Sequence, residues 1–170
     1  MLISEEYRKL QQEMHKNPYY GKTANTSYPL VLEIIKYVKA NKLLDYGAGK
    51  QLLKQYLPKN LPIFEYDPAI PEISSNPEPC DLVVCLDVLE HIEPEYIDDV
   101  LDDLKRVIKR VGFFTIATGP AKKLLPDGRN AHILQRPLSW WVTTLEKRFI
   151  VQHIQKFPYG YSILIYALHD

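Results

Sequence analysis

Residues 80–92 read CDLVVCLDVLEHI, and this stretch decides the fold. Its first half, residues 81–86, is apolar on both faces of an extended chain, as is typical of a central strand in a parallel sheet. Three ionisable residues follow at once, namely Asp87, Glu90 and His91. A buried strand that ends in polar residues predicts an open α/β sheet, with a ligand site at the carboxyl end of that strand.

Two more strands are predicted on the N-terminal side. Residues 42–46 form a short buried strand that runs into Gly-Ala-Gly at 47–49, and residues 62–66 form another that ends at Asp67. Glycines after a strand let the backbone approach a ligand, and an acidic residue after the next strand can accept hydrogen bonds from ribose hydroxyls. Together they predict a cofactor that contains a nucleoside, although the glycines alone are also typical of a tight strand-to-helix turn.

The rest of the chain alternates between predicted helices and strands. The expected helices cover about residues 4–16, 27–38 (capped by Ser27, with Pro29 in the first turn), 50–57, 94–110 and 137–147, and the remaining strands cover 113–118, 149–157 and 161–168. The last two strands form an antiparallel hairpin across a Pro-Tyr-Gly turn. This order predicts an α/β fold in which a mostly parallel sheet of about six strands lies between helices.

Composition narrows the class of protein. The 170 residues are 46% hydrophobic and 25% charged, which excludes wholesale disorder, and no apolar run reaches the roughly 20 residues that span a bilayer. A net charge of zero argues against a protein that coats nucleic acid, though not against a local site. Cys80 and Cys85 are expected to be buried thiols, and the first residues lack the pattern of a secretory signal, so we expect a cytoplasmic protein.

The stretch at 80–92 resembles the fourth-strand motif of the class I S-adenosylmethionine-dependent methyltransferases, whose small-molecule branch carries a VLEH motif there. Residues 43–49 resemble their first motif, 66–67 their second, 112–118 their fifth strand, and 130–149 the segment before their last two strands. The resemblance spans about residues 40–168 and also extends to compact phage-encoded methyltransferases. It implies a minimal Rossmann-like fold in a single domain, 1–170, with N-terminal helices at 1–41 and the core at 42–170.

The resemblance also implies a cofactor site. S-adenosylmethionine would be bound and S-adenosylhomocysteine released, with the methionine part along Gly47, Ala48 and Gly49 and its amino group near Asp45. The ribose would lie on Asp67. Asp87, Val88 and Leu89 would flank the sulfonium and the adenine.

Two departures from the family are visible. Gln51 stands where the family usually has a third small residue. Only thirteen residues separate Asp67 from Asp81, where the family fits a helix, a third strand and another helix. The usual third strand should therefore be reduced or missing, and we expect the backbone of the proline-rich stretch 68–79 to cover the adenine.

The reacting edge is assigned to Glu90, His91 and His132. In one interpretation these residues, with Asp87, hold a divalent cation that polarises a hydroxyl nucleophile. This pattern is similar to that of metal-dependent O-methyltransferases of the ubiquinone pathway and of small-RNA 3′ ends. In another, His132 is a metal-free base. In the plainest, Glu90 and His91 merely begin the long helix, where its positive end favours a carboxylate.

We expect methyl transfer to a small-molecule acceptor, at oxygen rather than carbon. The alternatives are an RNA 2′-O methyltransferase that uses the basic loop at 121–136, a non-catalytic binding module, and an enzyme that cleaves the cofactor. Tyr19 and Tyr20 are candidates for a lid, and Trp140 could line the pocket while Trp141 belongs to the core.

Overall fold

The computed structural model describes residues 1–22 and 24–168. In chain order, its elements are α1 (Glu5–Lys16), α2 (Ala24–Val38), β1 (Leu43–Tyr46), η1 (Leu53–Gln55), β2 (Ile63–Tyr66), η2 (Pro71–Ile73), β3 (Cys80–Leu86), η3 (Leu89–His91), α3 (Ile97–Val107), β4 (Ile108–Ala117), α4 (Leu138–Leu145), β5 (Phe149–Phe157) and β6 (Gly160–Ala167).

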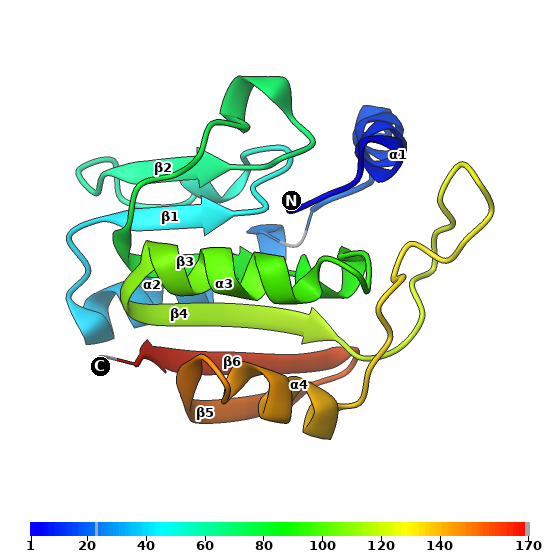
Figure 1. The fold of residues 1–170 in the computed structure, drawn as a ribbon. Helices are drawn as coiled ribbons and strands as arrows, with labels where there is room; N and C mark the ends of the chain where they lie inside the picture. The colour runs from blue at the N-terminus through cyan, green and yellow to red at the C-terminus, as the bar shows by residue number, and fades with distance from the viewer. Residues whose placement is uncertain (23, 169–170) are drawn as a thin grey trace.

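The sheet has six strands in the order β2-β1-β3-β4-β6-β5 (Figure 1). β1 pairs in parallel with both β2 and β3, and β3 pairs in parallel with β4. β6 pairs antiparallel with β4 and forms an antiparallel hairpin with β5. The predicted fold class is thereby confirmed. Between β2 and β3 the chain forms only the short η2, so β2 is the edge strand and the usual third strand is missing, as expected.

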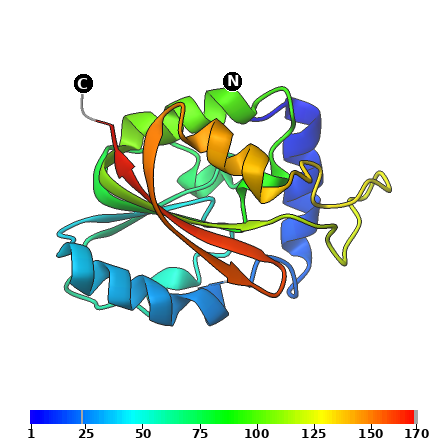
Figure 2. The ribbon, with the colours of Figure 1, turned by 90° about the horizontal axis from the view of Figure 1, so that it is seen from below.

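Helices cover both faces of the sheet (Figure 2). On one face, α2 packs Val31 and Ile34 into a core cluster with Leu43 of β1. On the other face, α3 and α4 contribute Leu104 and Trp141 to a second cluster. In residues 1–22 and 24–168, no helix has the length and apolar character that would let it cross a membrane.

α1 stands apart from these layers. It lies beyond the end of the sheet to which the parallel strands point, next to the long loop between β4 and α4 (Figure 1). Ser4 caps it, because its Oγ accepts a hydrogen bond from the Tyr7 N–H at 3.0 Å. α1 packs against that loop through a separate apolar cluster that includes Tyr7, Leu125 and Ala131. This helix therefore covers the carboxyl edge of the sheet.

Three predicted boundaries are wrong. The helix expected over 94–110 ends at Val107, and β4 begins at Ile108 because that residue pairs with Cys80 of β3. The helix expected from Ser27 begins at Ala24, which places Pro29 inside it. The helix expected over 50–57 is reduced to η1, since Gln51 has a left-handed φ of 57° that interrupts a helical run.

Candidate functional site

A cavity of about 540 Å³ opens at the carboxyl edge of the sheet. Its volume falls within the range of small-molecule sites. Most of the residues predicted for the cofactor line it, namely Asp45, Gly47, Ala48, Gly49, Asp67, Asp87 and Val88. His91 and His132 line it as well, whereas Leu89 and Glu90 lie buried behind the wall.

The glycine loop after β1 adopts a conformation that requires glycine. Gly47 and Gly49 have φ values of +82° and +46°, in the left-handed region. The backbone N–H groups of Gly47 and Ala48 both donate to the Tyr66 carbonyl oxygen, at 2.7 and 3.0 Å. A Cβ at Gly47 would lie 2.4 Å from Cγ2 of Val88, so this loop lies directly against the end of β3.

Asp45 is a buried carboxylate that faces the cavity. Burial, together with the nearby Glu65 and Asp67 carboxylates, raises its pKa to about 7. Within the described part of the chain, no group forms a hydrogen bond or ion pair with the Asp45 carboxylate. An ionised Asp45 would therefore be stabilised by a cation in the cavity, because a buried charge without a partner is costly.

Asp67 joins two loops of the cavity wall. Its Oδ2 accepts a hydrogen bond from the Gly49 N–H at 3.0 Å, and its Oδ1 accepts one from the Ala69 N–H at 2.9 Å. Burial raises the pKa of this carboxyl, although both backbone bonds and His15 oppose the shift. Each oxygen keeps a further lone pair for a ligand.

Asp87 is held in a strained position at the end of β3. Its φ of 53° is left-handed, and the Thr115 hydroxyl donates to its Oδ1 at 2.7 Å. Its own N–H donates to Thr115 Oγ1 at 2.9 Å. Strained residues of this kind gather at ligand sites.

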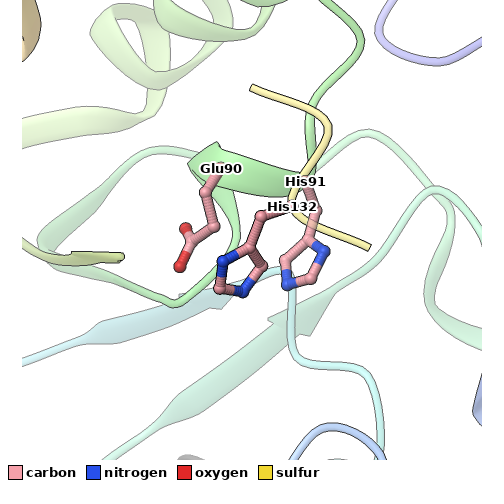
Figure 3. Close-up of side chains that lie close together, drawn as sticks. All are labelled: Glu90, His91 and His132. Atoms are coloured by element: carbon pink, nitrogen blue, oxygen red, sulfur yellow. The ribbon is translucent and has the colours of Figure 1, made fainter. Parts of the chain in front are cut away.

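Glu90, His91 and His132 come together although they belong to different segments. Each offers one ligand atom, and the three atoms lie within 4.8 Å of one another (Figure 3). Glu90 and His91 come from η3, whereas His132 comes from the loop before α4. The interpretation that Glu90 and His91 begin the long helix is wrong, because η3 ends at His91 and α3 begins only at Ile97. Asp87, predicted as a fourth ligand, is not part of the group.

Both imidazoles are oriented by backbone carbonyls. His91 Nδ1 lies 2.7 Å from the Ala131 carbonyl oxygen, and His132 Nδ1 lies 2.7 Å from that of Gly119. Because a carbonyl oxygen only accepts, each Nδ1 carries a proton, and a ring in its neutral form has its lone pair on Nε2. Burial, together with the adjacent His132, lowers the pKa of His91 to about 4, so His91 is neutral at pH 7.

Glu90 is fully buried behind the two rings. Its Oε1 accepts a hydrogen bond from the Ala117 N–H at 2.9 Å, which ties η3 to the end of β4. Its Oε2 is buried and has no hydrogen-bond partner among the described residues. Burial and the Asp87 carboxylate raise the pKa of Glu90 well above its usual range.

The N-terminal helix adds residues that the sequence analysis did not assign to the site. Tyr7, Gln11 and His15 line the cavity from α1, and Tyr20 lines it from the following loop. Their signal was a helical face with a repeat of four that carries polar and aromatic groups. Tyr19, the other predicted lid residue, is 75% exposed.

The structure also shows which residues of the basic loop and which tryptophans line the cavity. Lys122 and Lys123 line the cavity. Trp141 is fully buried in the core, as predicted. Trp140 packs edge-on against Trp141 and is not among the cavity-lining residues that the structure describes. Its predicted role in the pocket therefore finds no support in this geometry.

Solved structures show where this architecture recurs. A 1,6-didemethyltoxoflavin-N1-methyltransferase from Burkholderia thailandensis, with S-adenosylhomocysteine bound, is 15% identical at a TM-score of 0.67, over 99% of this chain and 92% of its own. A structure from Nostoc punctiforme named as an O-methyltransferase is 16% identical at a TM-score of 0.62, over 94% of this chain. This chain spans only 59% of that protein's length. The 16S rRNA methylase RmtB is 13% identical at a TM-score of 0.55, over 99% of this chain and 77% of its own.

No protein-family model matches the sequence, and no curated protein matches it either. Identities this low establish the fold and leave the activity to be argued from the site. The neighbours share the parallel sheet and the terminal antiparallel hairpin formed here by β4, β6 and β5. The chain thus has the Rossmann-like fold of the S-adenosylmethionine-dependent methyltransferases.

Proposed function

We propose that this protein transfers a methyl group from S-adenosylmethionine to an oxygen atom of a small molecule. The observation that carries the proposal is Asp45, a buried carboxylate without a partner among the described residues, which faces a cavity beside a glycine loop. The cofactor's amino group is the cation that such a carboxylate needs. That a neighbour of the same fold holds S-adenosylhomocysteine supports this choice.

The cavity offers a group for each part of the cofactor. Asp45 would pair with the ammonium, and the loop at 47–49 would lie along the methionine part. Asp67 would accept hydrogen bonds from the ribose hydroxyls, and residues 87–89 would border the sulfonium and the adenine. When bound, the cofactor supplies an already activated methyl group, so the protein mainly has to align the acceptor with it.

His132 is the proposed base. Its Nδ1 proton is directed at the Gly119 carbonyl, which leaves the Nε2 lone pair available at the cavity wall. Nε2 would take the proton from the acceptor hydroxyl as the oxygen bonds to the methyl carbon and the carbon–sulfur bond breaks. His91 and Glu90 would position His132, because they surround it from η3.

A binding measurement tests the cofactor assignment. We expect S-adenosylhomocysteine to bind with a dissociation constant on the order of micromolar in isothermal titration calorimetry. Absence of binding would favour the non-catalytic module instead. Formation of S-adenosylhomocysteine without any acceptor would favour the enzyme that cleaves the cofactor.

His132→Ala should lower methyl transfer by about 100-fold, because general-base catalysis contributes at least that much. S-adenosylhomocysteine affinity should stay within about twofold of wild type, since His132 lies on the acceptor side. Transfer of labelled methyl groups to a panel of phenols and alcohols measures the first quantity, and calorimetry measures the second. His153→Ala, on the exposed part of β5, is the matched control. Loss of cofactor affinity in His132→Ala would assign that residue to the cofactor pocket.

As the alternative to a metal-free His132 base, we also propose a divalent cation at Glu90, His91 and His132. The unpaired Glu90 Oε2 and the two Nε2 lone pairs fit a first-row cation, and the carbonyls on each Nδ1 are typical outer partners of metal-bound histidine. Such a cation would polarise the acceptor hydroxyl.

Manganese binding tests the cation site independently of activity. Titration with Mn²⁺, followed by electron paramagnetic resonance, should show one bound ion whose affinity falls at least about tenfold in His132→Ala. Asp87→Asn is the control and should bind Mn²⁺ like wild type, because the Asp87 carboxylate accepts from Thr115 instead. Equal binding by His132→Ala and wild type would contradict the site.

Transfer to RNA is the second candidate, favoured by Lys122 and Lys123 at the cavity and by the fold shared with an rRNA methylase. It requires RNA binding that weakens steeply with salt. The single domain over 1–170, the cytoplasmic location, the VLEH branch and the phage-type character remain predictions.

A further inference from the structure

His15 lies over the glycine loop although it belongs to the N-terminal helix. A Cβ at Gly49 would be 2.8 Å from the His15 Cε1, so the imidazole covers that glycine directly. The end of α1 is fixed there because Lys50 Nζ donates to the His15 and Asn17 carbonyl oxygens, at 2.8 and 2.7 Å. The imidazole is therefore held against the same loop that was assigned to the cofactor.

A second anchor ties α1 to the loop that follows β2. Gln12 Nε2 donates to the Ala69 carbonyl oxygen at 3.1 Å, and Ala69 in turn donates its N–H to Asp67. His15 consequently lies between the two loops that Asp67 joins. The Asp67 carboxylate interacts electrostatically with the imidazole.

The hydrogen bonding of His15 is incomplete. Its Nδ1 is buried and has no partner among the described residues, although the ring lines the cavity. Burial lowers the pKa of His15, so the ring is neutral near pH 7 and carries one N–H donor and one lone pair. A buried polar atom without a partner is costly, which indicates that a ligand completes the site.

The hydrogen-bonding positions that Asp67 and His15 leave unused complement a vicinal diol. Both carboxylate oxygens of Asp67 already accept one backbone N–H and can each accept one more hydrogen. Two neighbouring hydroxyls would fill those positions, but their own oxygens would then need a donor. The imidazole of His15 is the nearby neutral group that can donate to one of them.

We propose that His15 hydrogen-bonds one ribose hydroxyl of the cofactor, so that His15 and Asp67 together recognise the 2′,3′-diol. This inference rests on the proposed cofactor site and adds to it a residue from the N-terminal helix. It also gives α1 a function, because the helix then supplies a contact to the cofactor. The alternative is that His15 only fills space beside Gly49.

A cycle that combines protein and ligand changes separates these possibilities. The probes are S-adenosylhomocysteine and its 2′-deoxy and 3′-deoxy analogues, each titrated by calorimetry into wild type, His15→Ala and His15→Phe. His15→Phe keeps an aromatic ring over Gly49 but removes the hydrogen bond, and it remains informative should His15→Ala not fold. His153→Ala is the matched control, because it removes an exposed histidine of β5.

Both His15 variants should bind S-adenosylhomocysteine about tenfold more weakly than wild type. For one of the two deoxy analogues, the variants and wild type should differ by less than about twofold, because the hydroxyl that His15 contacts is already gone. That analogue identifies the hydroxyl. Equal losses on all three ligands, or a His15→Phe variant that binds like wild type, would overturn the proposal while the cofactor site stands. Failure of wild type to bind S-adenosylhomocysteine would instead overturn the proposed function and this inference with it.

Discussion

Gly47→Ala should weaken S-adenosylhomocysteine binding by about 100-fold, which corresponds to about 2.7 kcal/mol. Two separate effects add at this position. The residue has a φ of +82°, a conformation that costs an L-amino acid roughly 1–2 kcal/mol. The new Cβ would also lie 2.4 and 2.8 Å from the two Cγ atoms of Val88, so the glycine loop has to move away from the end of β3. Calorimetry with the folded variant measures the loss.

Two further variants divide this loss into its causes. Gly128→Ala has the same left-handed penalty, at a φ of +88°, but no described heavy atom lies within 4 Å of its new Cβ. It should lower stability by about 1 kcal/mol and leave binding within about twofold. The double variant Gly47→Ala/Val88→Ala removes both clashing Cγ atoms and should recover part of the affinity. If Gly47→Ala bound S-adenosylhomocysteine with the same affinity as wild type, the loop would not be part of the cofactor site.

The fold was largely predictable because its strongest signals are local. β3 is a continuous apolar run between proline-rich sequence and Asp87, and its prediction as a central strand is confirmed. The missing third strand followed from the short spacing between Asp67 and Asp81 compared with the family that the sequence resembles, since thirteen residues with several prolines leave no room for helix, strand and helix. The hairpin of β5 and β6 was marked by two strand-like segments on either side of a Pro-Tyr-Gly turn.

The wrong boundaries arise where tertiary contacts override a local pattern. Ile108 and Val111 continue the apolar helical spacing of α3, yet both residues pair with β3. Pairing between strands distant in sequence cannot be inferred from a repeat of three and four. Gln51 is similar, because nothing in its side chain signals the left-handed backbone that ends the expected helix.

The position of the candidate site at one edge of the sheet was predictable, but the contacts between its residues were not. Asp45, Gly47, Asp67 and Asp87 could be named because parallel strands bring their carboxyl ends to one edge. The partner of Asp87 is Thr115, in the neighbouring strand, and the carbonyl that orients His91 belongs to Ala131, 40 residues away. His15 was missed for the same reason, since its place beside Gly49 depends on how α1 lies across the sheet end.

S-adenosylhomocysteine affinity should increase about tenfold per pH unit from pH 5 to about 7 and level off above. Burial raises the pKa of Asp45 to about 7 in the unliganded protein. Below that pH the carboxyl is protonated and has to release its proton before it can pair with the ligand's ammonium. Calorimetry in buffers with different ionisation enthalpies should show that proton release at pH 6 and its absence at pH 8.

Asp45→Asn tests whether this carboxyl is responsible. The variant should bind about 100-fold more weakly at pH 8, because the pairing of a buried charge is lost, and most of the pH dependence should disappear. Any slope that survives in the variant belongs to Asp67 and His15, which interact with each other and whose pKa values are raised and lowered, respectively, by burial. A pH profile unchanged from wild type would show that Asp45 does not contact the ligand.

The raised pKa of Asp45 affects the stability of the unliganded protein in the opposite direction from its effect on ligand affinity. In the unfolded chain Asp45 titrates near its ordinary value of 3.8, so between about pH 4 and pH 7 the folded protein retains a proton that the unfolded chain has lost. The free energy of unfolding of the unliganded protein should therefore fall as pH rises through this window, and Asp45→Asn should reduce that fall. Saturating S-adenosylhomocysteine should abolish this fall, because Asp45 is then ionised in the liganded protein as it is in the unfolded chain. Urea denaturation at pH 5 and pH 8, with and without ligand, measures all four free energies. The contrary outcome is a free energy of unfolding that rises with pH in the unliganded wild type but not in Asp45→Asn. It would mean that Asp45 already has a cationic partner within the protein. Asp45 would then not be the group that binds the cofactor's amino group.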